Sequence, residues 1–300
     1  MIKKNIYIWT SDYSNFTGEG NLARLFVKKK LKNKYNIIIC KHKPKNYFSK
    51  NILNHKYFLP FLGIMNCWKY FILGKNTCYL NYLPYWNFFI FMFLPPQTIL
   101  GPITGGSYFK REFSLNYFVR NFIFPILYNL SSLILFFRSS KIIFSTDLLK
   151  KHLNTKLIKK SEFNFVLSAL NPKIKIKQKK NIDLIIYYKK HKNKMSLYPI
   201  DFIKKIVNLN FKVCIVGDIL NIHGVKNLGY LERKKLINIL NKCKYSISSG
   251  ENFFSFFTME CINSNVKIIT NKKINKLDKS IKNQILYINT DKKIKKQKIK

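Results

Sequence analysis

The chain has 300 residues, 47% of them apolar and 16% aromatic, so it can bury a sizeable core and wholesale disorder is excluded. Its formal net charge at pH 7 is +42, but only 5 of the 55 basic residues are arginine. This lysine excess, with many Asn, Ile, Phe and Tyr, follows AT-rich codons, whereas proteins that read nucleic acids rely on Arg for bidentate contacts. We therefore expect no specific nucleic-acid partner, while attraction to an anionic membrane surface is physically reasonable.

Hydropathy and cysteine spacing place further limits on the class of protein. The apolar run over 6–9 is too short for a secretory signal. No run of about 18 apolar residues is free of charges, Asn and Pro, so we expect no clean membrane span. The six cysteines form no Cys-x-x-Cys pair, which favours reduced, mostly buried thiols and a cytoplasmic protein.

The first half alternates short β-branched or aromatic runs with a helical pattern. Residues 5–10 and 35–40 predict buried strands, and the apolar spacing over 22–31 between them predicts a helix. A strand, helix and strand in this order form a βαβ unit, so we expect a parallel sheet. Further strands are expected at 77–83, 97–100 and 141–146.

An aromatic and Leu-rich segment over 113–137 permits two interpretations. It forms one or two core helices, kinked at Pro125, or it forms a helix that also touches a bilayer surface. Arg120, Asn121 and Asn129 would each be costly in the middle of a bilayer, so the second interpretation predicts binding without crossing.

The second half begins after a basic segment, 171–181, which starts with Asn-Pro and has few core residues. Beyond this expected linker, strands are predicted at 181–188, 212–217, 245–249, 266–270 and 285–288, with helices at 200–209, 232–243 and 254–264. We expect an α/β protein with two Rossmann-like domains, 1–165 and 166–288, followed by a basic tail, 289–300.

Ligands of open α/β sheets bind beyond the carboxyl ends of the strands, so the loops there supply the candidate residues. In the first half these loops are glycine-bearing, which lets backbone amides approach a phosphate or an acceptor; each is equally explained as a tight turn. The candidates are Gly18, Gly20, Gly105 and Gly106.

In the second half, the strand over 181–188 runs directly into a basic segment with Lys189 and Lys194. Cations at the mouth of a strand can hold a diphosphate, although in a lysine-rich chain a solvated run is the simpler interpretation. Gly217 closes the strand over 212–217 at the same edge.

The segment 248–260 carries two of the six glutamates, Glu251 and Glu260, on either side of an apolar run, with Gly250 before them. A buried carboxylate is costly without partners, but it can accept two hydrogen bonds from adjacent sugar hydroxyls. Otherwise, Glu251 serves the helix dipole and Glu260 faces solvent.

Taken together, these residues resemble the GT-B glycosyltransferases, specifically family 4, the group 1 glycosyltransferases. In that family a strand ends in Gly-Arg, with Lys-Gly following after four residues; Lys189 and Lys194 match the Arg and the Lys. The resemblance implies that they hold the donor diphosphate, and that the two domains face each other across a cleft. The segments VGD (216–218), NLGYLERKKLINILNKCKYSISS (227–249) and NVKIIT (265–270) also match the family pattern.

Departures from the family concern the Glu-x7-Glu motif. Eight residues separate Glu251 from Glu260, which puts Asn252 at the first position. Either Glu251 or Asn252 could contact the donor sugar, and the resemblance implies that Glu260 binds the nucleotide ribose. Lys189 lacks the bidentate fork of Arg, and Met195 replaces the usual Gly.

The resemblance implies a retaining glycosyltransferase, a hexosyltransferase, that moves sugar from a nucleotide-sugar donor to a glycan or lipid-linked acceptor in surface polysaccharide synthesis. No catalytic nucleophile is assigned, no cofactor is expected, and the lack of Asp-x-Asp gives no support for a metal site. The expected location is cytoplasmic, peripheral at the inner membrane face. The alternatives are a non-catalytic sugar-nucleotide-binding relative, motivated by the departures, and a basic nucleic-acid-binding protein, motivated by charge.

Overall fold

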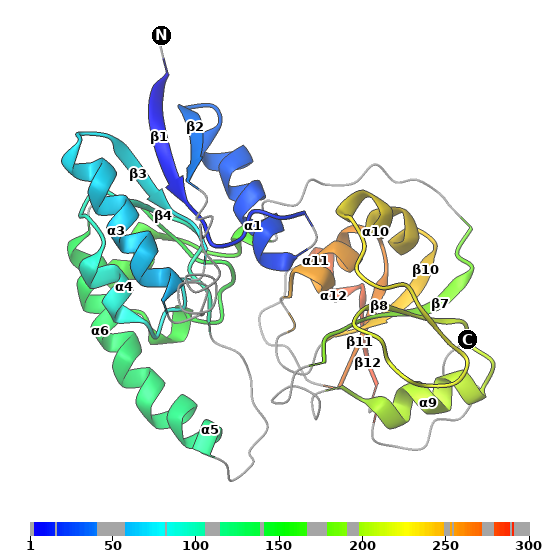
Figure 1. The fold of residues 1–300 in the computed structure, drawn as a ribbon. Coiled ribbons are helices and arrows are strands. Elements are labelled where there is room, and N and C mark those ends of the chain that lie inside the picture. Colours follow the sequence, from blue (N-terminus) through cyan, green and yellow to red (C-terminus); the bar gives the residue numbers. More distant parts are fainter. Residues whose placement is uncertain are drawn as a thin grey trace. The chain divides into compact units, whose positions relative to one another are not determined.

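The computed structural model divides the chain into two compact units, Met1–Ala169 and Leu170–Lys300 (Figure 1). The residues that it describes are 3–15, 17–40, 58–81, 83–105, 115–138, 141–166, 179–190, 198–248, 253, 255–271, 279–288 and 290.

The first unit is built on a parallel sheet with the strand order β2-β1-β3-β4. Ile6 of β1 pairs with Ile37 of β2 on one side and with Asn76 of β3 on the other. A bridge between Ile103 and Phe144 continues the hydrogen bonding toward a small parallel sheet of β5 and β6. The strands are β1 (Lys4–Trp9), β2 (Tyr35–Cys40), β3 (Asn76–Tyr79), β4 (Ile99–Leu100), β5 (Ile142–Ile143) and β6 (Ser161–Glu162).

Helices cover both faces of this sheet, with α1 on one side and α3, α4 and α6 on the other (Figure 1). Their apolar side chains close a core around Tyr85, Phe91, Leu100, Ile103 and Phe144. The helices are α1 (Gly18–Phe26), η1 (Val27–Leu31), α3 (Leu59–Ile72), α4 (Phe88–Phe93), α5 (Leu115–Phe118), η2 (Val119–Ile123), α6 (Phe124–Phe137), η3 (Lys150–His152) and α7 (Thr155–Lys160).

The segment predicted as helical over 113–137 forms α5, η2 and α6 in direct succession, with a π-helical turn ahead of Pro125. Val119–Phe137 is a 19-residue helix that is long and apolar enough to cross a membrane, and only 22% of its most apolar window is buried. Packing in the core therefore explains the apolar residues on one side of this helix but not those on its remaining surface.

The second unit has a six-stranded, fully parallel sheet with the order β12-β11-β10-β7-β8-β9. The chain starts at β7 in the middle, moves outward to β9, and crosses back to β10, which is the doubly wound Rossmann order. In Figure 1, α9 covers one face of the sheet, and α10 and α11 cover the other. The α/β class with parallel sheets is thereby confirmed.

The elements of this unit agree with the predicted alternation, apart from the short edge strand β9 and the one-turn helix α12, which were not predicted. The strands are β7 (Ile182–Tyr188), β8 (Val213–Gly217), β9 (Val225–Asn227), β10 (Cys243–Ile247), β11 (Lys267–Thr270) and β12 (Ile285–Tyr287). The helices are α9 (Ile200–Asn208), α10 (Arg233–Leu240), α11 (Phe256–Asn263) and α12 (Lys279–Lys282). Apolar residues of β7, β8 and α9 form its core, with Ile186, Phe202 and Ile215 at the centre.

Three details complete the fold. All six cysteines are free, and every one except Cys40 is buried, as expected from their scatter. Asn164, Asn210 and Asn265 have φ between 52° and 58°, the left-handed region in which glycine is favoured. Thr290 is buried and its hydroxyl accepts a hydrogen bond from the Asn271 amide at 3.4 Å, so the second unit extends past 288; the rest of the expected tail, 289 and 291–300, lies outside the described residues.

Candidate functional site

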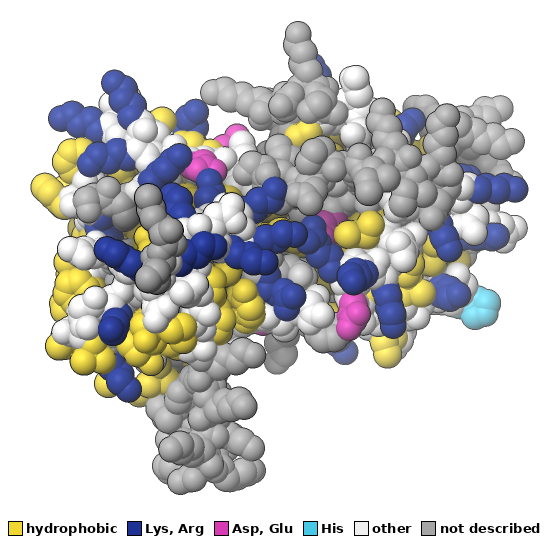
Figure 2. All heavy atoms as spheres, turned by 90° about the horizontal axis from the view of Figure 1, so that it is seen from above, with side chains coloured by type: hydrophobic (Ala, Val, Ile, Leu, Met, Phe, Trp, Pro, Cys, Tyr) yellow, Lys and Arg dark blue, Asp and Glu magenta, His cyan; other side chains and the backbone are white. Residues whose placement is uncertain are grey.

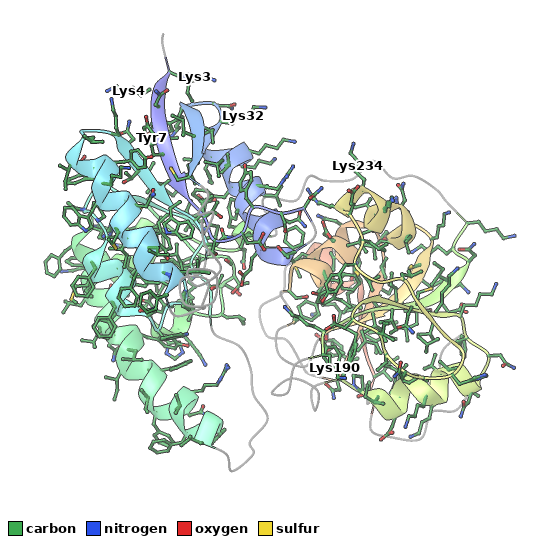
Figure 3. All side chains as sticks on the ribbon, in the orientation of Figure 1. Lys3, Lys4, Tyr7, Lys32, Lys190 and Lys234 are labelled. Atoms are coloured by element: carbon green, nitrogen blue, oxygen red, sulfur yellow. The ribbon has the colours of Figure 1, made fainter. Side chains whose placement is uncertain are left out.

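The switch point of the second sheet lies between β7 and β10, because the chain leaves these neighbouring strands toward opposite edges. In doubly wound sheets, ligands bind outside the carboxyl ends of the strands at this point. Lys189 and Lys190 follow β7 there, and both side chains are exposed (Figure 3 labels Lys190). The other flank is Ser248, directly after β10, which is buried.

Asp218, immediately after β8, is the centre of a hydrogen-bonded group at the carboxyl ends of the strands, an end of the sheet here called the carboxyl edge. One carboxylate oxygen accepts from the Lys190 amide and the other from the Tyr230 hydroxyl, both at 2.7 Å. These two hydrogen bonds and the nearby charges of Lys189 and Lys190 hold the pKa of the Asp218 carboxyl below its ordinary value. The hydrogen bond that the Tyr230 hydroxyl donates to Asp218 also raises the pKa of Tyr230 to about 12. At neutral pH, Asp218 is therefore an ionised carboxylate close to Lys189 and Lys190.

Glu260 lies in α11, the helix that follows β10, and is 3% exposed. Its Oε1 accepts a hydrogen bond from Nε of Arg233 in α10 at 2.6 Å. Burial raises the pKa of the Glu260 carboxyl, and the Arg233 guanidinium opposes that rise. The solvent-facing alternative for Glu260 is therefore wrong, since the carboxylate is buried and paired.

Two links join these groups along the edge. Tyr230 and Arg233 are three residues apart, and their side chains reach Asp218 after β8 and Glu260 after β10, respectively. The Tyr187 ring, near the end of β7, lies 5.6 Å from the ring of Phe257, which is one helical turn before Glu260. The ends of β7 and β8 and the start of α11 are thus brought together at the switch point.

Gly217 is explained by the chain itself. Its φ is 106°, and a Cβ at this position would lie 2.3 Å from the Tyr188 carbonyl oxygen. Its amide donates to the Gly229 carbonyl at 2.9 Å. Gly217 therefore permits close packing of the β8 end against the β7 end, and a contact with a donor stays a prediction.

Gly18 and Gly20 lie in the first turn of α1, where Thr17 is the N-cap. The Gly20 amide donates to the Thr17 hydroxyl at 3.0 Å, and a Cβ on Gly20 would lie 2.3 Å from the Ser14 carbonyl oxygen. Asp12 holds this loop by accepting from the Ser14 amide at 2.8 Å. The structure thus gives Gly20 the tight-turn role; the phosphate or acceptor role stays a prediction.

Gly105 has φ 140° and packs near the Leu149 side chain. Lys194, Gly250, Glu251, Asn252 and Gly106 lie outside the described residues. A shared donor site for Lys189, Lys194 and Glu260 therefore stays a prediction: Lys189 follows β7, and Glu260 lies in the helix that follows the neighbouring strand β10.

Asp218, Tyr230 and Arg233 were not predicted as site residues. A signal for them was present, because all three lie in the segments 216–218 and 227–249 that carry the family resemblance. Their pairing depends on tertiary contacts across 12 and 27 residues, which spacing along the chain does not specify.

No protein-family model matches the sequence, and no curated protein sequence matches it either. The structure has similarities to solved structures. S. aureus MnaA, in a co-structure with UDP, shares 12% identity at a TM-score of 0.49, covering 91% of this chain and 80% of that chain. The UDP-N-acetylglucosamine 2-epimerase from Rickettsia bellii shares 12% at 0.47, with 91% and 80% covered. A glycosyltransferase from Rickettsia africae shares 13% at 0.40, with 89% and 79% covered. The α/β class of this chain rests on its own strand order and parallel pairing.

Proposed function

We propose that the chain is a sugar-nucleotide enzyme of the GT-B type, a glycosyltransferase resembling family 4. The observation that carries the proposal is the set of groups at the switch point of the second sheet: two exposed lysines after β7, and a buried carboxylate, Glu260, in the helix after β10. A diphosphate needs cations, and sugar or ribose hydroxyls need carboxylate acceptors; this edge supplies both.

In this proposal Lys189 and Lys190 neutralise the donor diphosphate as it leaves. Asp218 fixes the backbone that carries them, because it accepts from the Lys190 amide. Cationic side chains stabilise the charge that develops on the leaving group, so transfer at this edge needs no bridging metal. The acceptor is a glycan or lipid-linked sugar in surface polysaccharide synthesis, and transfer proceeds with retention; both statements extend the family resemblance.

Glu260 enters the proposal with a modified role. Its Oε1 is held by Arg233, whose side chain is about one third exposed. A ribose hydroxyl can therefore meet the pair through Arg233 as well as through the carboxylate. Loss of either partner weakens donor binding.

Thermal-shift measurements with a panel of nucleotide-sugars test donor binding. A ligand at about 100 times its dissociation constant stabilises the native state by about 2.7 kcal/mol. The variant Lys189→Ala should lose most of the shift, whereas Lys212→Ala should keep it, because Lys212 precedes β8 at the opposite end of the strands. Equal ligand-induced thermal shifts in the two variants would contradict a donor site at the carboxyl ends of the strands.

Donor hydrolysis separates the enzyme from a binding protein. The enzyme should release nucleoside diphosphate from the donor that gives the largest shift, slowly without acceptor and faster with membrane lipid extract. Binding without hydrolysis under either condition would favour the non-catalytic relative.

A further inference from the structure

The first unit exposes many large apolar side chains on α3, α4 and the helix formed by α5, η2 and α6. Large apolar side chains there are between 55% and 76% exposed: Phe61, Met65, Ile72, Phe122, Ile126 and Phe137. No residue of η2 is buried, and in Figure 1 α5 projects past the other labelled elements of its unit. Scattered exposed apolar residues are normal, but a contiguous set marks an interaction surface.

Two side-chain contacts show that these helices are neighbours. The Trp68 indole of α3 donates to the Phe93 carbonyl of α4 at 2.7 Å. Arg138, at the end of α6, donates to the carbonyls of Phe91 and Pro95 at 3.0 Å and 2.6 Å. Helix α4 therefore lies between α3 and α6, and their exposed side chains form one surface, here called the apolar face. Figure 2 shows apolar side chains gathered on the first unit, with Lys and Arg side chains beside them.

Among the described residues of 58–105 and 115–138, which include the helices of the apolar face, the charged side chains all have one sign. Segments 58–105 and 115–138 contain no Asp or Glu. Three cations lie over aromatic rings of these helices, in the pairs Lys69 with Tyr70, Arg120 with Phe124 and Lys160 with Phe136, at 5.8 Å, 5.9 Å and 4.9 Å. A two-fold contact with a second copy would repeat these cations on both sides of the interface. An anionic lipid surface offers apolar chains and negative headgroups together, and so complements both features.

The polar contacts of α6 decide between lying on a bilayer and crossing it. At about 1.5 Å per residue, 19 residues would span roughly the hydrocarbon core. However, Ser131 donates to the Tyr85 carbonyl at 2.6 Å, and the Ser132 hydroxyl lies 2.5 Å from the Tyr85 hydroxyl. Together with the bonds of the buried Arg138, these contacts attach one side of α6 to the unit. Crossing would break all of them, whereas lying in the membrane plane uses only the exposed side.

We propose that the apolar face docks into one leaflet of an anionic bilayer, with α3, α4 and α6 lying in the interface and no helix crossing it. This surface belongs to the first unit and is independent of the donor site proposed above. It serves as a monotopic membrane contact.

Flotation of the full chain with vesicles tests the docking. Vesicles of phosphatidylcholine are compared with vesicles of equal parts phosphatidylcholine and phosphatidylglycerol. The chain should bind the anionic vesicles tightly and the neutral ones weakly. Substituting three exposed side chains, Phe61→Ser, Met65→Ser and Ile72→Ser, should lower the partition coefficient at least about a hundred-fold, since each large apolar side chain withdrawn from water is worth about tenfold.

A matched control uses exposed apolar side chains of the second unit. Ile219→Ser with Tyr287→Ser removes two residues that are 68% and 49% exposed, and should leave binding unchanged. Depth is read from tryptophan fluorescence with brominated acyl chains. Trp68 is exposed on α3, so bromine should quench the fluorescence, and Trp68→Phe should remove most of that quenching.

Each other outcome overturns the proposal. If the triple variant Phe61→Ser, Met65→Ser, Ile72→Ser (the α3 variant) bound anionic vesicles as well as the control variant does, the membrane contact would lie elsewhere. If alkaline carbonate failed to extract the bound protein from the vesicles, a helix would cross the membrane. Failure to bind either vesicle overturns docking, and concentration-dependent dimers that the α3 variant abolishes would then identify a second copy as the occupant.

Discussion

The Arg233–Glu260 pair allows a prediction whose magnitude follows from the structure. Replacing Arg233 with Met removes the cation beside a carboxylate that is 3% exposed. The buried carboxyl can then stay ionised at a high cost or take up a proton. Protonation costs about 1.36 kcal/mol for each pH unit above the ordinary pKa of 4.5, so the carboxyl contributes a loss of at most about 3–4 kcal/mol at pH 7.

The sign of the pH dependence follows from the same reasoning. In Arg233→Met, the pKa of Glu260 in the folded state rises further above its unfolded value. The native state then binds more protons than the unfolded state, and stability falls as pH increases. The stability difference from the native sequence should therefore be small at about pH 5, at most about 1 kcal/mol from this carboxyl, and should grow toward about pH 7.

Urea unfolding followed by circular dichroism at several pH values measures this difference. The three tryptophans all precede residue 87, so their fluorescence reports the first unit and should be unaffected. Lys234→Met, at the exposed neighbouring position of α10, is the matched control (Figure 3). Adding Glu260→Gln to Arg233→Met should abolish the extra pH dependence. A stability loss in Arg233→Met that is the same at all pH values would refute the reasoning.

Three further predictions concern single positions. Arg138→Lys keeps the charge but loses the fork that reaches several carbonyls, so the tryptophan-detected unfolding of the first unit should shift by about 2–4 kcal/mol. Gly217→Ala meets the Tyr188 carbonyl at 2.3 Å and should destabilise strongly, whereas Gly229→Ala, with nothing within 4 Å, should cost only about 1 kcal/mol in thermal or urea unfolding. Burial alone would raise the pKa of Glu162, but nearby lysine ammonium groups outweigh it and hold that pKa below its ordinary 4.5. The stability difference between the native sequence and Glu162→Gln should therefore be present near neutral pH. It should vanish as the pH falls through the lowered pKa of Glu162, as measured by urea unfolding at stepwise lower pH.

The strands and helices of the second unit were predictable because strands buried on both faces are continuous apolar runs, as in β7 and β8. Helices α3 and α4 were not predicted, because Leu59–Ile72 is apolar on nearly all sides and offers no polar face to set a period. Strand β9 was missed because a three-residue edge strand containing Lys and Asn carries almost no pattern.

The candidate site was predictable where position along a strand decides it, as for Lys189 after β7. The burial of Glu260 was not, because one acid in an apolar helix fits either a paired or a solvated side chain. The deciding group, Arg233, approaches only when α10 and α11 pack on the same face of the sheet. The exposure of Val119–Phe137 was equally hidden, since composition alone cannot separate a core helix from a surface helix.

The asparagines with left-handed φ angles reduce the number of glycines that the turns of this chain need. Asn210 follows α9 and Asn265 follows α11, at turns where glycine costs least, yet the chain has only 11 glycines. Asparagine tolerates the same dihedral angles and is encoded by AT-rich codons. It can therefore occupy a turn position at which glycine is usually favoured. A chain that uses asparagine at such positions forms these turns with few glycines, so glycine in its sequence is a poor guide to where its turns lie.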